Sequence, residues 1–213
     1  MPTARESLLD AALSALGDRS WATIRMVDVA AVAGVSRQTL YNEFGSKEGL
    51  ARALARRAAD EFLAGVERAL DTAARHGADA GDCFAAATAW TLHSARRSPL
   101  VRAALTGCRG DRVPAAAIVP VPVPHVPVPR VAGRRSRGDD GPLAPAELLD
   151  AVRVRAAAAL GRRFPRLDQA ETGWACEAAV RLTVSYVVAP AASDEEACLR
   201  VARLVRGLLQ RGW

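Results

Sequence analysis

Apolar and polar residues recur along most of this chain with the spacing of amphipathic helices. Apolar residues separated by three or four positions share one face of a helix, whereas a half-buried strand would need strict alternation. This pattern runs from Leu8 to Leu16 and returns in later stretches at residues 46–70, 80–97, 99–105, 146–163, 168–189 and 193–209. The sequence therefore predicts an all-α protein.

The first predicted helix carries its own start and stop signals. Thr3 and Glu6 have the spacing of a capping box, in which each side chain accepts a hydrogen bond from a free backbone N–H of the first turn. Gly17 directly follows the apolar stripe and supplies a stop. We expect this helix to share a small core with the two short helices that follow.

Two short helices are predicted within residues 26–47, joined by a turn that contains Gly34 and Val35. A glycine at this point allows a positive φ, so the chain can turn sharply. Ser36 is a strong N-cap for the second helix. The first helix has one stripe to bury, formed by Met26, Val29, Ala30 and Ala33. The arrangement is the sequence form of a helix-turn-helix.

The second short helix has a polar outward face. Leu40 and Phe44 lie four residues apart and point inward, which leaves Arg37, Gln38, Thr39 and Asn42 facing outward. Arginine can pair with guanine and glutamine or asparagine with adenine, and a recognition helix presents its N-terminal residues to the major groove. The pattern favours DNA binding, although an ordinary solvated face would have the same composition.

Lys47 is the only lysine of the chain and follows Ser46, the expected N-cap of the next helix. A cation at a helix N-terminus is disfavoured by about 0.3–1 kcal/mol. A DNA phosphate at this position would compensate, because it would bind both the ammonium group and the free backbone N–H groups. Alternatively, the flexible stem carries the charge into water.

The N-terminal 60 residues resemble the DNA-binding domain of the tetracycline-repressor (TetR) family. The resemblance covers residues 3–63 and lies in the run Val29-Ala30, Ala33-Gly34-Val35-Ser36, Leu40-Tyr41, Phe44, Ser46-Lys47-Glu48 and Leu50. It implies a homodimeric, all-helical regulator that binds double-stranded DNA. It also implies base contacts from Arg37, Gln38, Thr39 and Asn42, with phosphate contacts from Tyr41 and Lys47.

Two positions depart from the family pattern. Arg25 stands where relatives commonly carry Ser or Thr as a helix cap, so Thr23 is a possible substitute cap and Arg25 an additional phosphate ligand. Glu43 stands where Tyr or His is frequent. Because phosphate repels a carboxylate, we expect Glu43 to face away from DNA or to accept a hydrogen bond from a cytosine amino group.

Two domains are predicted, a helix-turn-helix domain at residues 1–63 and a helical regulatory and dimerisation domain at residues 64–213. Residues 113–145 of the second domain hold eight of the twelve prolines, which predicts a loop or polyproline II segment. A flexible insertion, a docking site for a proline-binding partner and a basic arm that touches DNA are all compatible with this composition.

The last predicted helix is amphipathic over a wide face. Ser193 and Glu196 form a second capping box, and Gly207 permits close approach of another helix. By the resemblance, the last two long helices pair across a two-fold axis as a four-helix bundle, and packing within one subunit is the alternative. The expected interface residues are Trp174, Leu182, Val201, Leu204, Val205 and Leu208. Two domains one helical turn apart would bind a palindromic operator.

A pocket for a small-molecule effector is likewise implied by the resemblance. Its candidate lining residues are Phe84, Trp90, His93 and Trp174, although each residue is also compatible with ordinary core packing. His93 has no carboxylate or cysteine at ligand spacing, so no metal and no cofactor are expected. No catalytic motif is visible, so we do not expect an enzyme.

Composition limits the function classes further. The formal net charge is +6, but residues 1–60 hold eight basic and seven acidic side chains, so DNA affinity must come from local placement. The four cysteines are scattered, which argues against a zinc site or disulfides. No apolar run is long enough to span a bilayer and no signal peptide precedes the first helix, so we expect a cytoplasmic protein without a membrane partner.

The sequence thus favours a dimeric transcriptional repressor whose operator affinity falls when a small molecule binds the second domain. One alternative is a helical small-molecule-binding protein or enzyme that keeps the first domain only as a folding unit. Another is an architectural DNA-binding protein, which would show steep salt dependence but little sequence preference.

Overall fold

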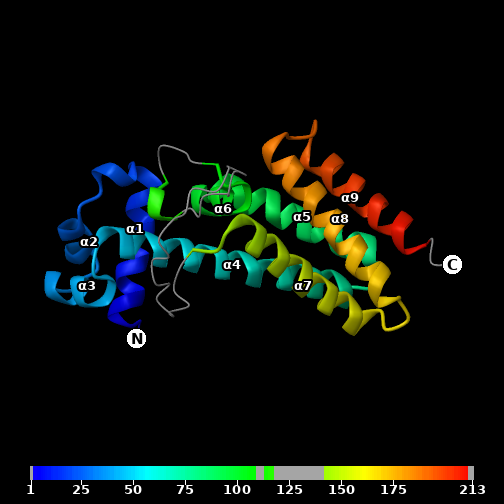
Figure 1. Cartoon of the computed structure of the whole chain (residues 1–213), viewed down its shortest axis with the longest axis horizontal. Helices are drawn as coiled ribbons and strands as arrows, with labels where there is room; N and C mark the ends of the chain where they lie inside the picture. The colour runs from blue at the N-terminus through cyan, green and yellow to red at the C-terminus, as the bar shows by residue number, and fades with distance from the viewer. Residues whose placement is uncertain (1, 109–112, 118–141, 211–213) are drawn as a thin grey trace, which may run out of the picture.

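The computed structural model describes residues 2–108, 113–117 and 142–210, and it is helical with no strand in these residues, as predicted. Three short helices at one end are joined by a long helix, α4, to a bundle of helices at the other end (Figure 1). None of the helices in the described ranges has the length and apolar character needed to cross a bilayer.

The N-terminal part consists of α1 (Ala4–Asp18), α2 (Met26–Val32) and α3 (Arg37–Phe44), with a 3₁₀ turn at Trp21–Thr23. The capping box of α1 is confirmed, because the Thr3 hydroxyl accepts from Glu6 N at 3.2 Å and the Glu6 carboxylate accepts from Thr3 N at 2.7 Å. The buried core of this part includes Leu8, Ala12, Leu16, Val29, Ala30, Leu40 and Phe44. These are the apolar stripes that the sequence pattern predicts.

Helix α4 (Lys47–Arg75) runs for 29 residues without a break. At 1.5 Å per residue its length is roughly 43 Å. Leu50 and Leu54 are buried at its N-terminal end, and Phe62, Val66 and Leu70 are buried further along. The predicted domain boundary at residue 63 therefore falls inside a continuous helix and not in a linker.

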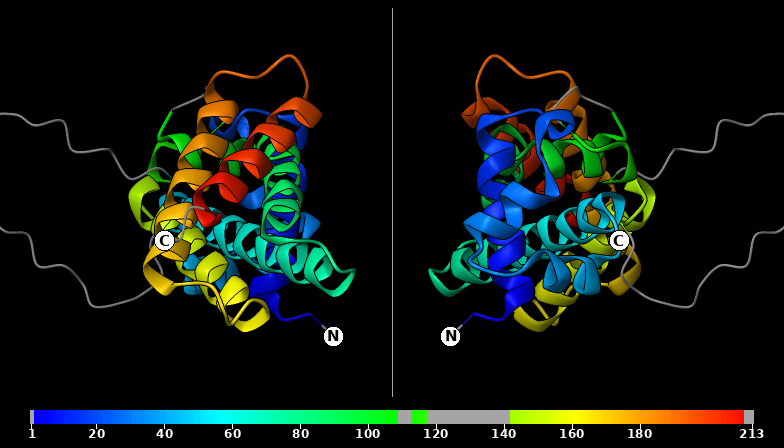
Figure 2. Two further views of the ribbon diagram at one scale, coloured as in Figure 1. Left: turned by 90° about the vertical axis from the view of Figure 1, so that its right-hand side faces the viewer. Right: turned by 90° about the vertical axis from the view of Figure 1, so that its left-hand side faces the viewer.

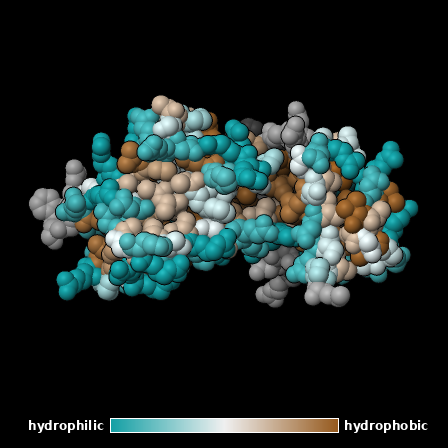
Figure 3. Space-filling model, turned by 180° about the vertical axis from the view of Figure 1, so that it is seen from behind, coloured by the Kyte–Doolittle hydropathy of each residue, from teal (hydrophilic) through white to brown (hydrophobic). Residues whose placement is uncertain are grey.

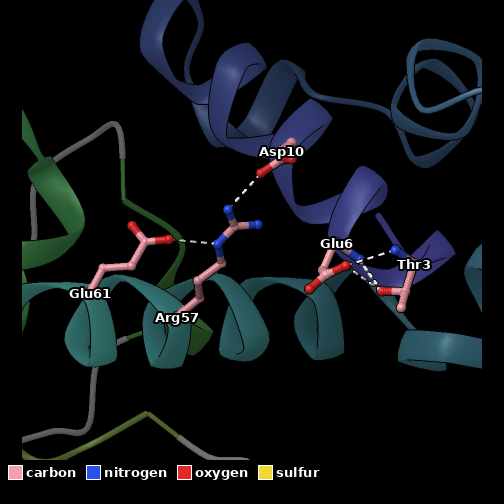
Figure 4. Close-up of polar contacts among 5 residues, drawn as sticks. All are labelled: Thr3, Glu6, Asp10, Arg57 and Glu61. Atoms are coloured by element: carbon pink, nitrogen blue, oxygen red, sulfur yellow. Dashed lines mark hydrogen bonds and ion pairs between the residues drawn. The ribbon is translucent and has the colours of Figure 1, made fainter. Parts of the chain in front are cut away.

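Arg57 ties α1 to α4 (Figure 4). Its guanidinium Nη2 lies 2.6 Å from Asp10 Oδ1 on α1, and its Nε donates to Glu61 Oε1 one turn further along α4 at 2.8 Å. The third nitrogen, Nη1, is buried without a hydrogen-bond partner. A guanidinium held from two sides restrains the angle between α1 and α4, so the N-terminal part is expected to move with α4.

The C-terminal part contains α5 (Ala80–Arg97), α6 (Pro99–Thr106), α7 (Pro145–Arg163), α8 (Gln169–Val188) and α9 (Asp194–Leu209). Helix α5 packs between α4 and α9, and α8 packs between α7 and α9. Seen end-on, α8 and α9 lie side by side while α7 runs along the α4 side of the bundle (Figure 2).

Two glycines permit the closest helix contacts of this bundle. A Cβ on Gly65 of α4 would lie 2.1 Å from the Trp90 ring of α5, and the Trp90 indole N–H donates to the Phe62 carbonyl of α4 at 3.1 Å. A Cβ on Gly81 of α5 would lie 2.8 Å from the Ala202 carbonyl of α9. Only a residue without a side chain fits at either crossing.

An ion-pair cluster reinforces the α5–α9 contact near Gly81. The Arg206 guanidinium of α9 lies 2.7 Å from Asp79 Oδ2 and also pairs with Asp82 at the start of α5. The hydrogen bonds from Arg206 hold the pKa of Asp79 below its usual value. The cluster fixes the end of α9 against the corner between α4 and α5.

The proline-rich segment is largely outside the described residues, which omit 118–141. Within the predicted loop over 113–145, the structure describes only residues 113–117 and 142–145. Ala115–Ala117 form a 3₁₀ turn in which Ala117 is buried, and the turn packs against α4. Helix α7 begins inside the segment at Pro145, because proline suits the first helical position, where no N–H is needed.

Candidate DNA interface and effector cavity

The turn between α2 and α3 has the geometry that the sequence predicts. Gly34 adopts a φ of 68°, and the Val35 N–H donates to the Ala30 carbonyl at 3.1 Å across the corner. Ser36 caps α3, because its hydroxyl accepts from Thr39 N at 3.0 Å. These bonds fix where α3 begins and which of its sides faces away from the core.

The outward face of α3 presents polar groups that are already partly ordered. Arg37, Gln38 and Asn42 are exposed, and the Gln38 amide donates to Asn42 Oδ1 at 3.0 Å. This bond leaves the Gln38 carbonyl oxygen and the Asn42 N–H groups free, which is the acceptor and donor combination that an adenine edge needs. Thr39 is half-buried and its hydroxyl contacts that of Ser36 at 2.9 Å, so it is less available to a base than its neighbours.

Lys47 begins α4 beside the recognition face. Ser46 is its N-cap, accepting from Gly49 N at 3.1 Å, as predicted. The Lys47 ammonium lies 5.2 Å from the centre of the Trp21 ring and donates to the Ala22 carbonyl at 3.4 Å. The ring therefore orients the cation, a contact that the sequence does not reveal because the two residues lie 26 positions apart.

The two departures from the family pattern have structural outcomes. Arg25 is exposed and occupies the N-cap position of α2 without a side-chain cap bond. Thr23 does not replace that cap, so this prediction is wrong, because its hydroxyl donates to the Ser20 carbonyl at 2.8 Å. Glu43 lies 3.7 Å from Arg5 of α1, and this ion pair turns its carboxylate toward α1.

Tyr41 completes the set of exposed residues on this surface. Its side chain is partly exposed, on the same short helix as Arg37 and Asn42. Arg25, Arg37 and Lys47 supply the local positive charge that a nearly neutral N-terminal part needs to attract phosphate. The helix-turn-helix therefore combines exposed polar groups on α3 with cations at the starts of α2, α3 and α4.

A narrow apolar cavity lies in the C-terminal part. Its volume is about 20 Å³, by the measure in which a single water molecule needs about 10–15 Å³. Helices α4 to α8 all contribute to the wall, which is formed by Phe62, Val66, Phe84, Ala87, Thr88, Thr91, Leu105, Leu149, Val152, Ala156, Val180, Thr183 and Val184. No charged side chain is among these residues.

Of the four predicted pocket residues, only Phe84 lines the cavity. Trp90 turns toward α4 to reach the Phe62 carbonyl, and His93 is exposed. Trp174 is 61% exposed on α8 and points away from the bundle. These three residues lie outside this cavity, because helical periodicity alone does not say which neighbour each helix face meets.

Three buried threonines supply the cavity with its polar atoms. The Thr91 hydroxyl donates to the Ala87 carbonyl and the Thr183 hydroxyl to the Ala179 carbonyl, both at 2.8 Å. Thr88 contacts the Thr183 hydroxyl at 3.1 Å. The sequence pattern did not lead us to predict Thr88 and Thr183 as cavity residues, although a hydroxyl on an otherwise apolar helix face can indicate a polar position in a cavity wall.

The predicted interface residues on α8 and α9 fall into two groups by their exposure. Val201 and Val205 have no exposed surface, because they pack inside the subunit, so a direct contact with a partner is excluded for them. Trp174 is exposed, and Leu182, Leu204 and Leu208 are half-buried.

The outward side of α9 is hollowed. Leu204, Gly207 and Leu208 line a shallow depression that Arg200 and Arg203 border. Leu199 and Val188 are additional large apolar residues exposed on α9 and α8. Figure 3 shows the molecule from behind, where mildly apolar residues lie in the middle of this half and hydrophilic residues surround them.

Comparison with known proteins agrees with both halves of this arrangement. The family described as "Bacterial regulatory proteins, tetR family" matches residues 8–54, and the family "Bacterial Tetracyclin repressor, C-terminal domain" matches residues 143–206. The HTH-type transcriptional regulator AlkX of Mycobacterium tuberculosis is 32% identical over 97% of this chain and 85% of its own length.

Solved structures have the same fold at lower identity. The TetR family repressor AlkX from Dietzia sp., which is implicated in biodegradation of n-alkanes, has a TM-score of 0.60 at 20% identity, and the match covers 96% of this chain and 97% of that protein. A tetR-family regulator from Streptomyces coelicolor has a TM-score of 0.56 at 14% identity, over 98% of this chain and 82% of its own. With a helix-turn-helix at one end, a helical bundle at the other and a relative of this similarity along nearly its whole length, the chain belongs to the TetR family of DNA-binding transcriptional regulators.

Proposed function

We propose that this protein is a homodimeric repressor that binds a palindromic operator and releases it when a small molecule enters the cavity of the C-terminal part. The observation that carries the proposal is the exposed face of α3, where Arg37 stands beside a hydrogen-bonded Gln38–Asn42 pair. Such a regulator acts beside the bacterial chromosome, in the cytoplasm, and needs no catalytic residue.

The proposed base contacts come from α3. Arg37 donates to a guanine, and the Gln38–Asn42 pair contacts an adenine, because the pair offers both an acceptor and donors. Thr39 contributes its methyl group to a thymine methyl, since its hydroxyl is engaged with Ser36.

The proposed phosphate contacts surround α3. Lys47 and the first N–H groups of α4 bind one phosphate, Tyr41 and Ser36 donate from their hydroxyls, and Arg25 adds charge at the start of α2. These contacts set the register of the protein on the duplex and carry no base preference of their own.

The proposed dimer forms through the outer faces of α8 and α9. Trp174, Leu182, Leu204 and Leu208 retain exposed surface there, and Gly207 lets a second helix approach closely. Burying an exposed tryptophan and several leucines offers the apolar area that an interface core needs. The two-fold axis would place two α3 helices about one turn of DNA apart.

Regulation is proposed to pass through α4. Phe62 and Val66 form part of the cavity wall, and Lys47, a proposed phosphate contact, is the first residue of the same helix. A molecule that enlarges the cavity displaces α4 relative to the rest of the bundle. Because Arg57 holds α1 to α4, the whole N-terminal part follows.

DNA binding is tested by fluorescence anisotropy with the DNA beside the gene of this protein and with random duplex of equal length. Arg37→Ala and Gln38→Ala are each expected to cost about 1–3 kcal/mol on the specific site and to relax the preference at one base pair. Arg75→Ala, at the far end of α4, is the matched control and should leave the affinity unchanged. Equal affinity for both duplexes would instead indicate an architectural DNA-binding protein.

Dimerisation is tested by light scattering of the Leu204→Glu variant. A carboxylate in the centre of the depression should produce monomers. Val154→Glu places the same charge at an exposed apolar site on α7 and should leave the dimer intact. A dimer that persists in Leu204→Glu would remove the outer face of α9 from the interface.

A further inference from the structure

The cavity of the C-terminal part has a hydrogen-bonding character that narrows the class of effector. A threonine hydroxyl has one hydrogen to donate and two lone pairs that accept. Thr91 uses its hydrogen on the Ala87 carbonyl and Thr183 on the Ala179 carbonyl. Because Thr183 has then no hydrogen left, Thr88 must be the donor in the contact between Thr88 and Thr183.

All three hydroxyl hydrogens are therefore used within the protein. Lone pairs remain open on all three oxygens, two each on Thr88 and Thr91 and one on Thr183, and the three residues line the cavity. The polar positions in the wall consequently accept hydrogen bonds and have none to donate. A ligand group that donates is complementary to them, whereas a carbonyl or ether oxygen would meet only other lone pairs.

The rest of the wall excludes charge. Every other lining residue is Phe, Val, Leu or Ala, and the wall contains no cation that would pair with a carboxylate. Transfer of an unpaired charged group into such surroundings costs far more than one hydrogen bond returns. An acid, an ammonium ion or a phosphorylated compound is disfavoured by this wall.

The shape of the cavity favours a slender molecule. Its volume of about 20 Å³ is hardly more than a water molecule needs, so a ligand must part the helices to enter. Leu149 of α7 and Val184 of α8 are half-buried while the remaining lining residues are buried, so the cavity wall is nearest to solvent at these two helices. A thin, flexible chain displaces fewer side chains there than a ring system does.

We propose that the effector is an uncharged, straight-chain amphiphile with an apolar tail and a terminal hydroxyl, and that this hydroxyl donates to Thr88, Thr91 or Thr183. The inference rests on the proposed regulation by a small molecule and names the chemistry of that molecule. It concerns binding to the protein alone and does not depend on which operator is recognised.

The test compares matched ligands on the full-length protein without DNA. The straight-chain alcohols from hexanol to dodecanol are titrated by calorimetry and by tryptophan fluorescence, because the Trp90 indole contacts α4 beside the cavity. Heptyl methyl ether is an isomer of octanol that accepts hydrogen bonds but does not donate them, and octanoate is the charged analogue of octanol. Octanol should bind about threefold to tenfold more tightly than the ether and at least about a hundredfold more tightly than octanoate.

Variants of the three threonines locate the effect. In Thr88→Val/Thr91→Val/Thr183→Val the alcohol should bind no better than the ether, because the shape is kept and all three acceptors are lost, while the double variant Thr88→Val/Thr91→Val, which keeps the acceptor on Thr183, should show a smaller preference than the unaltered protein. Thr88→Ser/Thr91→Ser keeps all three acceptors and should retain the preference. If the valine variants do not fold, the ligand comparison on the unaltered protein still decides.

Three results overturn the proposal: equal affinity for octanol and its ether isomer, tighter binding of octanoate, or no binding of any alcohol in the series. These results are independent of operator binding, which is measured with DNA and without ligand. A protein that binds its operator but no alcohol would keep the proposed regulator and lose this effector class.

Discussion

The Lys47 side chain combines a proposed DNA contact with a structural one, and its replacement by alanine tests both. The Lys47 ammonium has three N–H groups, one of which donates to the Ala22 carbonyl, while the charge lies over the Trp21 ring. Two N–H groups therefore remain for a DNA phosphate. Lys47→Ala should remove a phosphate contact and a cation–π contact at the same time.

The two losses have different magnitudes and different readouts. Each phosphate contact contributes about 0.9 to the slope of log K against log salt. A dimer with two Lys47 residues would thus lose about 1.8 from its slope. The fall in DNA affinity between about 50 and 200 mM salt would then be roughly twelvefold smaller in the variant. The lost cation–π contact should lower the free energy of unfolding by about 0.5–1 kcal/mol.

Fluorescence anisotropy across a salt series and thermal unfolding measure the two effects on the same variants. Lys47→Arg should keep the slope, since the charge remains. Trp21→Leu should lower stability yet keep the slope, because it removes the ring and leaves the ammonium. The reasoning is refuted if Lys47→Ala unfolds more easily while its salt slope stays unchanged, since Lys47 would then be only a packing partner of Trp21.

Further predictions concern the stability and reactivity of the bundle. Gly65→Ala should destabilise the protein by about 1–3 kcal/mol in thermal or urea unfolding, because its Cβ would lie 2.1 Å from the indole of α5. The control Gly161→Ala has open space at the new Cβ and should be neutral or slightly stabilising. Burial raises the pKa of Cys176 to about 12, so at neutral pH this thiol should not react with a disulfide reagent until the chain unfolds. The exposed Cys108 should react at once. Labelling of Cys176 before unfolding would contradict its burial. Because the pKa of Asp79 is lowered, its ion pair stabilises the fold above about pH 4 and ceases to do so as the pH falls through that lowered value. Asp79→Asn should therefore reduce the loss of stability at acid pH in unfolding measurements. An unchanged loss of stability at acid pH would contradict the assignment.

The sequence predicts the helix-turn-helix well because its signals are local. Gly34 and Ser36 fix the turn through their own backbone angle and side chain, and both act within four residues. Each short helix has a single apolar stripe, so there is only one way to place its inner face. The outward residues of α3 follow from that placement without knowledge of any distant contact.

The C-terminal part is less predictable because its helices have more than one apolar face. Helix α9 carries Val201 and Val205 toward its own subunit and Leu204 and Leu208 outward, and periodicity does not say which face meets the same chain. The cavity also depends on how five helices meet. Neither assignment is encoded within one element, so periodicity alone does not decide which residues line the cavity and which are left on the outer surface.

Because α4 is continuous, we expect the proposed coupling to act through a rigid tilt of this helix and not through a series of small rearrangements. Lys47 and Phe62 lie on one helix about 22 Å apart, so a tilt of about 5° near the cavity moves the DNA end by roughly 2 Å. Trp90 holds α4 against α5 at Gly65, next to the cavity residues Phe62 and Val66, so the pivot and the ligand wall coincide. Since binding energies are reciprocal, operator DNA must weaken effector binding by the factor by which the effector weakens the operator. A bulkier residue at position 65 would alter how far α4 can tilt. It must therefore change both factors together, the effect of the effector on operator binding and the effect of the operator on effector binding.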